Sequence, residues 1–141
     1  MRIEKHYRKQ NNKYEKYISC DSLEETREIY QFLVDFFDRA AAETTKILAD
    51  KSSDEPLPYL AVQRNKVVSR ENKFQACFDL VELKSKMALP VRLQLFLDFS
   101  ENTVILFVDV AHQLFASYDP LMEEFISKVS ASLPEILASK K

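Results

Sequence analysis

The sequence predicts an α+β fold in which an antiparallel sheet of three to five strands carries three helices, with at least one helix packed on the sheet. Residues 90 to 110, PVRLQLFLDFSENTVILFVDV, hold two alternating apolar segments around a polar turn, as in a hairpin. Residues 22 to 50 and 119 to 133 carry apolar side chains at helical spacing. With 141 residues, the chain has the usual length of one domain.

The N-terminal residues 1–13 are expected to form a flexible basic arm ahead of a single domain at residues 14–141. Residues 1 to 16 carry six basic and two acidic side chains, whereas the whole chain has a net charge of −2 and a pI of about 5.8. Residues 14 to 20, YEKYISC, follow as a short edge strand.

A long amphipathic helix is expected over residues 23 to 50. Ser22 precedes Glu25 by three residues, which is the capping-box spacing. The polar segment at 51 to 58 contains two prolines and predicts a loop, and residues 59 to 69 predict one strand or a small hairpin.

Residues 70 to 88 fit two patterns. Alternation of apolar side chains favours a strand, whereas the spacing of Phe74, Cys77, Phe78 and Val81 favours a helix. An unbroken polar stripe on the opposite side leads us to predict the helix.

The hairpin is expected to turn at Glu101 and Asn102, which pairs Phe99 with Val104. One face of the hairpin is then wholly apolar and is expected to belong to the hydrophobic core. Its members are Leu93, Leu95, Leu97, Phe99, Val104, Leu106, Val108 and Val110. The other face is mixed and consists of Arg92, Gln94, Phe96, Asp98, Ile105, Phe107 and Asp109.

The last helix is expected to begin with Asp119 as its cap and Pro120 in its first position. Pro134 should end or kink this helix near Leu133, because proline removes a backbone hydrogen bond and clashes with the preceding turn.

The sequence contains no glycine, where average usage of about 7% gives roughly ten. The phosphate-binding P-loop, the dinucleotide-binding turn and the nucleophile elbow of hydrolases all require glycine. These three classes of site are therefore excluded.

Few residues are available for metal or nucleophilic chemistry. A zinc site would need Cys20, Cys77, His6 and His112, which lie far apart and include no local ligand pair. A nucleophilic pair of Cys77 and His112 is conceivable, but a buried thiol and a loop histidine are the favoured interpretation. We therefore expect no metal, no cofactor and no enzymatic activity.

Two arrangements of acidic residues could also suggest a site. Asp98 and Asp109 share one hairpin face, but the expected register puts them about 13 Å apart, too far to act as a pair. Glu82 and Lys84, with Asp54 upstream, resemble the carboxylate–lysine doublet of nucleases, although on a helix they point apart.

No apolar run approaches the roughly 18 residues that span a bilayer, and no apolar segment follows the first charges as in a signal peptide. We expect a cytoplasmic protein that does not enter membranes. In that compartment, Cys20 and Cys77 should remain free thiols.

The leading functional prediction is a small protein-binding module of the adaptor, chaperone or inhibitor type, which binds a protein partner or a second copy of itself. Its candidate interface is Phe96, Ile105 and Phe107, unless the helix at 23–50 or 70–88 covers them. The alternative is a nucleic-acid-associated protein that uses the basic arm. The candidate contacts there are Arg2, Lys5, Arg8, Lys9 and Lys13, with Lys16, Tyr7, Tyr14 and Tyr17 interleaved.

Overall fold

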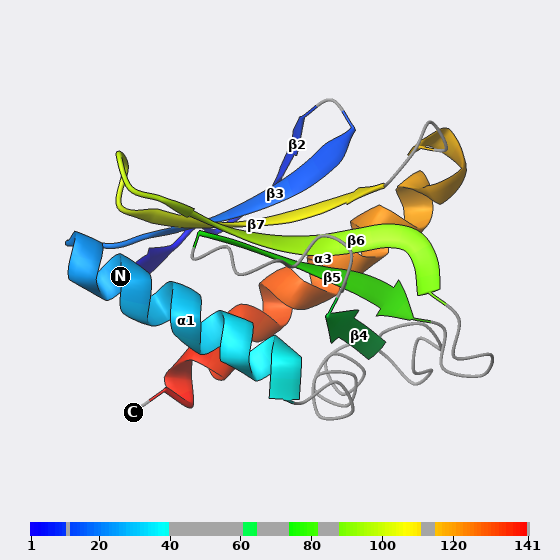
Figure 1. Cartoon of the computed structure of the whole chain (residues 1–141). Coiled ribbons are helices and arrows are strands. Elements are labelled where there is room, and N and C mark those ends of the chain that lie inside the picture. The colour runs from blue at the N-terminus through cyan, green and yellow to red at the C-terminus, as the bar shows by residue number, and fades with distance from the viewer. Residues whose placement is uncertain (11, 40–60, 65–73, 82–87, 111–114, 141) are drawn as a thin grey trace.

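The computed structural model describes residues 1–10, 12–39, 61–64, 74–81, 88–110 and 115–140 (Figure 1). Within them the chain is α+β, with seven strands and two helices. In chain order they are β1 (Arg2–Ile3), β2 (Arg8–Gln10), β3 (Lys13–Ser19), α1 (Leu23–Arg39), β4 (Ala61–Arg64), β5 (Gln75–Val81), β6 (Ala88–Asp98), β7 (Thr103–Val110) and α3 (Phe115–Ala138).

All strands belong to one antiparallel sheet in the order β1-β3-β7-β6-β5-β4, and β2 also pairs with β3. Both described helices lie on the same side of this sheet (Figure 1). Helix α1 packs on β4, β6 and β7, and α3 packs on β3 and β7. We call the helix side the inner face and the other side the outer face.

Strict alternation along the central hairpin builds the core. From Val91 to Asp98, every second residue is buried, as a strand covered on one side requires. The inner-facing side chains that pack with the helices include Val91, Leu93, Leu95, Leu97, Val104, Leu106 and Val108.

The hairpin turn is two residues longer than expected, because residues 99–102 all lie between the strands. Leu97 pairs with Val104 and Asp98 with Thr103, so Phe99 lies in the turn and is 39% exposed. This shift of two residues in the pairing leaves the strand side chains on their predicted faces, whereas the prediction of Phe99 as a core residue is wrong. Asn102 has a φ of 48°, which is the left-handed conformation that glycine would otherwise supply.

The predicted helix over residues 70 to 88 is wrong, because Gln75–Val81 is strand β5. It pairs with β4 on one side and β6 on the other, so the sheet satisfies its backbone hydrogen bonds. Ala76, Phe78 and Leu80 are buried in the core, as the strand pattern predicts. The two periodicities coexist in this segment, and the partners available in the sheet decide between them.

The N-terminal part also differs from expectation. Strand β3 is not at an edge, because it pairs with β7 on one side and with β1 and β2 on the other. The segment expected to be an arm therefore contains two strands, β1 and β2. Next to β1, Glu4 N donates to Tyr17 O of β3 at 3.0 Å.

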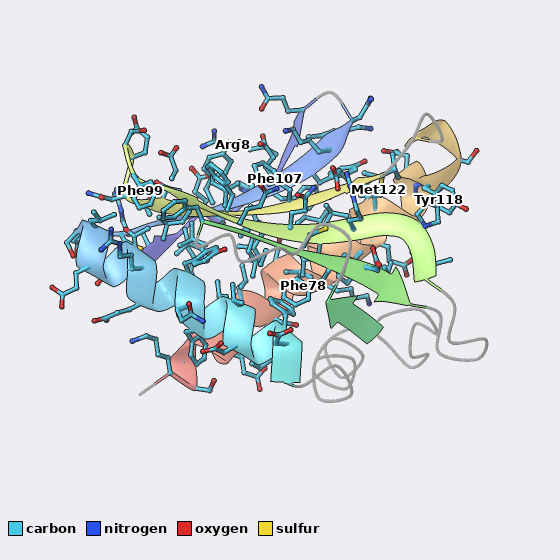
Figure 2. All side chains as sticks on the ribbon, viewed as in Figure 1. Arg8, Phe78, Phe99, Phe107, Tyr118 and Met122 are labelled. Atoms are coloured by element: carbon cyan, nitrogen blue, oxygen red, sulfur yellow. The ribbon has the colours of Figure 1, made fainter. Side chains whose placement is uncertain are left out.

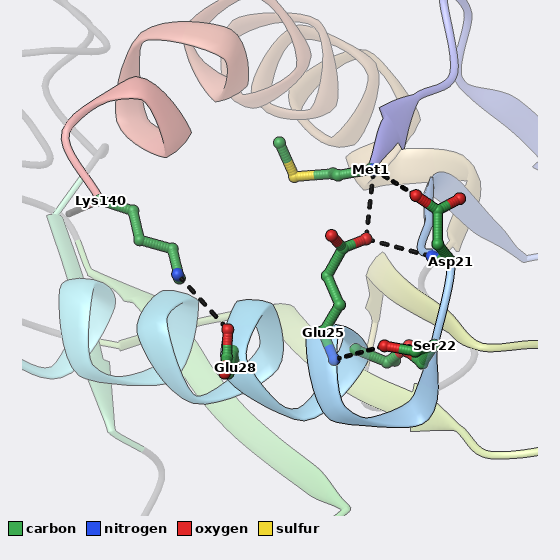
Figure 3. A network of polar contacts seen from close by, with 7 residues as sticks. Met1, Asp21, Ser22, Glu25, Glu28 and Lys140 are labelled. Carbon is green, nitrogen blue, oxygen red and sulfur yellow. Dashed lines mark hydrogen bonds and ion pairs between the residues drawn. The ribbon is translucent and has the colours of Figure 1, made fainter.

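Helix α1 begins with the predicted capping residues (Figure 3). The Glu25 amide donates to Ser22 Oγ at 3.1 Å, and the Asp21 amide donates to Glu25 Oε1 at 3.1 Å. The Met1 amine lies 3.1 Å from the same carboxylate oxygen. These contacts hold the pKa of Glu25 below its usual value, chiefly through the Asp21 amide and then through the Met1 amine. Residues 40 to 50 of the predicted helix and the loop at 51 to 58 lie outside the described residues.

Helix α3 is longer than expected at both ends. It begins at Phe115, so Asp119 is not its cap and Pro120 lies inside it. It also continues past Pro134 to Ala138. Ile136 and Leu137 are buried beyond the proline, and this packing supports the last turns. At the far end, Lys140 Nζ lies 3.8 Å from Glu28 Oε2 of α1 (Figure 3).

Candidate binding face of the sheet

The outer face carries the predicted interface residues. Phe96 pairs with Ile105 across β6 and β7, and Phe107 lies diagonally next to them. The rings of Phe96 and Phe107 are 6.5 Å apart between centroids. All three residues lie outside the core cluster that the helices form with the sheet. Figure 2 shows Phe107 on the side of the sheet opposite to Phe78, which points toward the helices.

Neither predicted helix covers these side chains. Helix α1 lies on the inner face, and residues 75–81 are a strand beside β6. Phe96 and Phe107 are partly exposed, whereas Ile105 between the strands is only 7% exposed. The alternative that the helix at 23–50 or 70–88 hides the pair is therefore wrong for the part of the chain that the structure describes.

Strand β3 adds an aromatic residue and one cation to this face, and β2 adds a second cation. Tyr17 pairs with Ile105, which extends the apolar area toward the N-terminal strands. The Arg8 guanidinium carbon lies 4.1 Å from the centre of the Tyr17 ring, and Lys13 Nζ lies 4.7 Å from that of Phe107. Such cation–π contacts contribute about 0.5 to 1 kcal/mol at exposed sites. We call Tyr17, Phe96, Ile105 and Phe107 the aromatic patch.

Glu15 lies beside the aromatic patch and has an unused acceptor. It is 5% exposed, and Oε1 has no hydrogen-bond partner among the described residues. In the sheet it pairs with Phe107 on one side and Arg8 on the other, so its side chain belongs to the outer face. Burial, followed by the negative charge of Glu15, raises the pKa of Tyr17. A buried acceptor without a donor costs about 1 to 3 kcal/mol, and functional contacts are one reason for its retention.

A row of four charges with alternating signs crosses the outer face next to the patch. Lys13 pairs with Asp109, Asp109 with Arg92, and Arg92 with Asp79, from β3 to β5. Arg92 Nη2 and Nε lie 2.9 and 3.3 Å from the two carboxylate oxygens of Asp109. We call Lys13, Asp109, Arg92 and Asp79 the charged row.

Two glutamines extend the hydrogen bonds of this row, Gln94 on β6 and Gln75 on β5. Gln94 Nε2 donates to the Asp109 oxygens at 3.1 and 3.2 Å, and Gln75 Nε2 donates to Gln94 Oε1 at 2.6 Å. The aromatic patch is therefore bordered by side chains whose positions are fixed by hydrogen bonds.

The predicted basic contacts do not form one surface. Arg8 pairs with Glu4 at 2.5 Å, and Lys9 lies 3.3 Å from Asp119 of α3. Arg8 and Lys13 belong to the outer face, whereas Lys9 pairs with Tyr14, which points inward. The Arg2 and Lys5 side chains are exposed. Lys16 is 2% exposed on the inner face, where it donates to the Glu4 carbonyl, and burial lowers its pKa.

The predicted catalytic and metal candidates that the structure describes form no common site. His6 is exposed, Cys20 is partly buried and Cys77 is buried, and neither cysteine forms a disulfide. In the described residues, no group of three or more His, Cys, Asp or Glu side chains could hold a metal. The remaining candidates, His112, Glu82, Lys84 and Asp54, lie outside the described residues.

Asp98 and Asp109 are farther apart than expected. Asp109 opposes Arg92, six residues along β6 from Asp98, which corresponds to about 20 Å at ~3.3 Å per residue.

No described helix is both long enough and apolar enough to cross a membrane.

The contribution of β3 to this face is not apparent from the sequence alone. The alternation of Lys13, Glu15 and Tyr17 against Tyr14, Lys16 and Ile18 is present in the sequence, but Glu15 and Lys16 mask it because both faces carry a charge. The pairing of β3 with β7 was the missing information.

Comparison of the chain with protein-family profiles, with curated proteins and with solved structures finds no significant match.

Proposed function

We propose that this chain is a small non-enzymatic protein-binding module, of the adaptor, chaperone or inhibitor type, and that the outer face of its sheet is the binding surface. The observation that supports this proposal most is the position of both described helices on the inner face. Phe96, Ile105 and Phe107 consequently contribute nothing to the core beneath those helices.

The composition of the outer face is typical of a protein interface. Interface centres are enriched in aromatic side chains and arginine, and polar residues surround them. Here the aromatic patch occupies the middle of the face, and the Arg92–Asp109 ion pair with its two glutamines forms a polar border. Preformed hydrogen bonds at such a border reduce the entropy that is lost when a partner binds.

A pair of matched variants tests this proposal. Phe96→Asp places a charge in the aromatic patch, whereas Phe99→Asp makes the same change in the exposed turn of the same hairpin. We expect the chain and the Phe99→Asp control to capture the same proteins from a lysate, and Phe96→Asp to lose them while its circular dichroism stays unchanged. A folded Phe96→Asp variant that retains both its assembly state and all its partners would contradict the proposal.

Nucleic-acid binding by the basic N-terminal residues is the alternative. The exposed Arg2 and Lys5 side chains favour it, whereas the ion pairs of Arg8 and Lys9 within the chain count against it. Deleting the segment would also remove β1 and β2, so the cleaner test is Arg2→Ala with Lys5→Ala. Unchanged affinity for DNA and RNA, with an unchanged salt dependence, would remove this alternative.

A further inference from the structure

We propose that the partner bound by the outer face is a second copy of this chain, packed face to face about a two-fold axis that runs parallel to the strands, between β6 and β7. This inference rests on the proposed role of the outer face as a binding surface. Closed two-fold dimers are the commonest oligomers of soluble proteins, and they require a surface that complements itself.

The charged row has this self-complementarity. From β3 to β5 its signs are positive, negative, positive and negative. A two-fold axis parallel to the strands places the strands of the second copy in reverse order across the interface. Each row of one copy therefore faces the same row of the other. Lys13 of one copy then faces Asp79 of the other, and Asp109 faces Arg92. All four positions meet an opposite charge, which happens for an alternating row only when the axis passes through its middle.

The geometry of packed sheets allows these contacts. Aligned sheets lie about 10 Å apart and cross at about 30°. With strands ~4.8 Å apart, β3 and β5 each lie about 7 Å from the axis, and the crossing displaces their facing residues by roughly 3 to 4 Å. The long Lys13 side chain spans such an offset.

The same axis brings the aromatic patches together. Tyr17, Ile105, Phe96 and Gln75 form a neighbouring row across β3, β7, β6 and β5. On reversal, Ile105 of each copy faces Phe96 of the other, next to the axis. Burial of Tyr17, Phe96 and Phe107, which are partly exposed in one copy, supplies the apolar gain, and the charged row fixes the register.

The unused acceptor of Glu15 lies within this arrangement. Strand β3 of one copy lies over β5 of the other, so Gln75 of the second copy faces Tyr17, which is two residues from Glu15 on the same face. In the structure, Gln75 Nε2 donates to Gln94 Oε1, and an amide nitrogen carries two hydrogens. Glu15 Oε1 has no hydrogen-bond partner among the described residues, and the donor that the second copy offers lies two residues, about 7 Å, along the facing strand.

The size of the face is compatible with a dimer. Five strands at ~4.8 Å and seven residues at ~3.3 Å give a projected area on the order of 550 Å². The accessible area of a face covered by side chains exceeds its projection, and stable interfaces bury about 800 Å² per partner.

Charge reversal across the axis provides the test. Lys13→Glu and Asp79→Lys each turn two facing pairs repulsive, so we expect each variant to raise the dimer dissociation constant about tenfold. The double variant Lys13→Glu, Asp79→Lys restores opposite charges and should recover most of that loss. Within one chain the two residues are three strand spacings, about 14 Å, apart, so recovery cannot come from contact inside a chain. Sedimentation equilibrium over a concentration series measures all four proteins.

The possible outcomes separate this inference from the proposed function. A dimer of twice 16.5 kDa, weakened by each single change and recovered by the double one, supports both. A monomer whose capture of another protein is lost in Phe96→Asp overturns the second copy as the partner but leaves the proposed function standing. A dimer in which the double variant shows no recovery overturns this axis. If neither the dimer nor any captured protein responds to Phe96→Asp, both proposals fail.

Discussion

The hydroxyl of Tyr14 on β3 donates a 2.6 Å hydrogen bond to Oδ1 of Asp119 on α3, and thereby joins two elements 105 residues apart in the sequence. Lys9 from β2 lies 5.4 Å from the centre of the Tyr14 ring and 3.3 Å from the same carboxylate oxygen. The N-terminal strands are thus attached to the last helix at a point where the sequence predicted a flexible arm and a helix cap.

Tyr14→Phe should destabilise the chain by about 1.5 to 3 kcal/mol, because a hydrogen bond to a charged group from a buried hydroxyl is lost. Urea unfolding measures this change. Tyr7→Phe is the matched control, since the Tyr7 hydroxyl makes a longer bond of 3.3 Å to Glu123 at the surface. Equal effects of the two changes would contradict a special role for the Tyr14–Asp119 contact.

Alkaline pH should weaken the same contact. Burial, followed by the hydrogen bond to Asp119, raises the pKa of Tyr14 to about 12. Its usual value is 10.0, so the stabilisation is complete below pH 10 and is lost as the pH rises toward 12. Between these values the free energy of unfolding should fall more steeply for the unmodified chain than for Tyr14→Phe. If the free energy of unfolding falls equally steeply with pH in the two proteins, ionisation of Tyr14 does not weaken this contact.

Low pH should weaken the contacts at the start of α1. The pKa of Glu25 lies below its usual 4.5, so its contribution is complete above that value and is lost as the pH falls through the lower, folded-state pKa. Glu25→Gln should therefore cost stability at pH 7 and little at pH 3, as measured by thermal unfolding. A cost that stays constant over this range would show that the charge of Glu25 is not involved.

The hairpin turn should respond to changes at Asn102. Glycine adopts a φ of 48° without a Cβ clash, so Asn102→Gly should be neutral or slightly stabilising. Asn102→Val should cost about 1 to 2 kcal/mol or more, because a branched side chain disfavours the left-handed region. Urea midpoints compare the two variants directly, and similar values would contradict the assigned turn conformation.

Much of the fold could be predicted because the relevant signals are local. The capping residues Ser22 and Glu25 and the alternation along residues 91 to 98 depend on neighbours in the sequence, and both are confirmed. The α+β class and the antiparallel sheet follow from these elements.

The remaining differences arise from contacts between distant segments. Residues 75–81 satisfy both a helical and a strand pattern, and only the pairing with β4 and β6 selects the strand. Pro134 stays inside α3 because Ile136 and Leu137 are buried beyond it.

Only part of the candidate site could be predicted from the sequence, because the rest depends on contacts between distant segments. Phe96, Ile105 and Phe107 lie on one hairpin, whose alternation already places them together. Tyr17, Glu15 and Lys13 join them only through the pairing of β3 with β7. The charged row needs the order of four strands, which no local pattern contains.

The most direct test of the outer face as a binding surface is the sedimentation of the unmodified chain, Phe96→Asp and Phe99→Asp under identical conditions. We expect the unmodified chain and Phe99→Asp to assemble alike, and Phe96→Asp to sediment as a folded monomer. Identical assembly of all three folded proteins would contradict it.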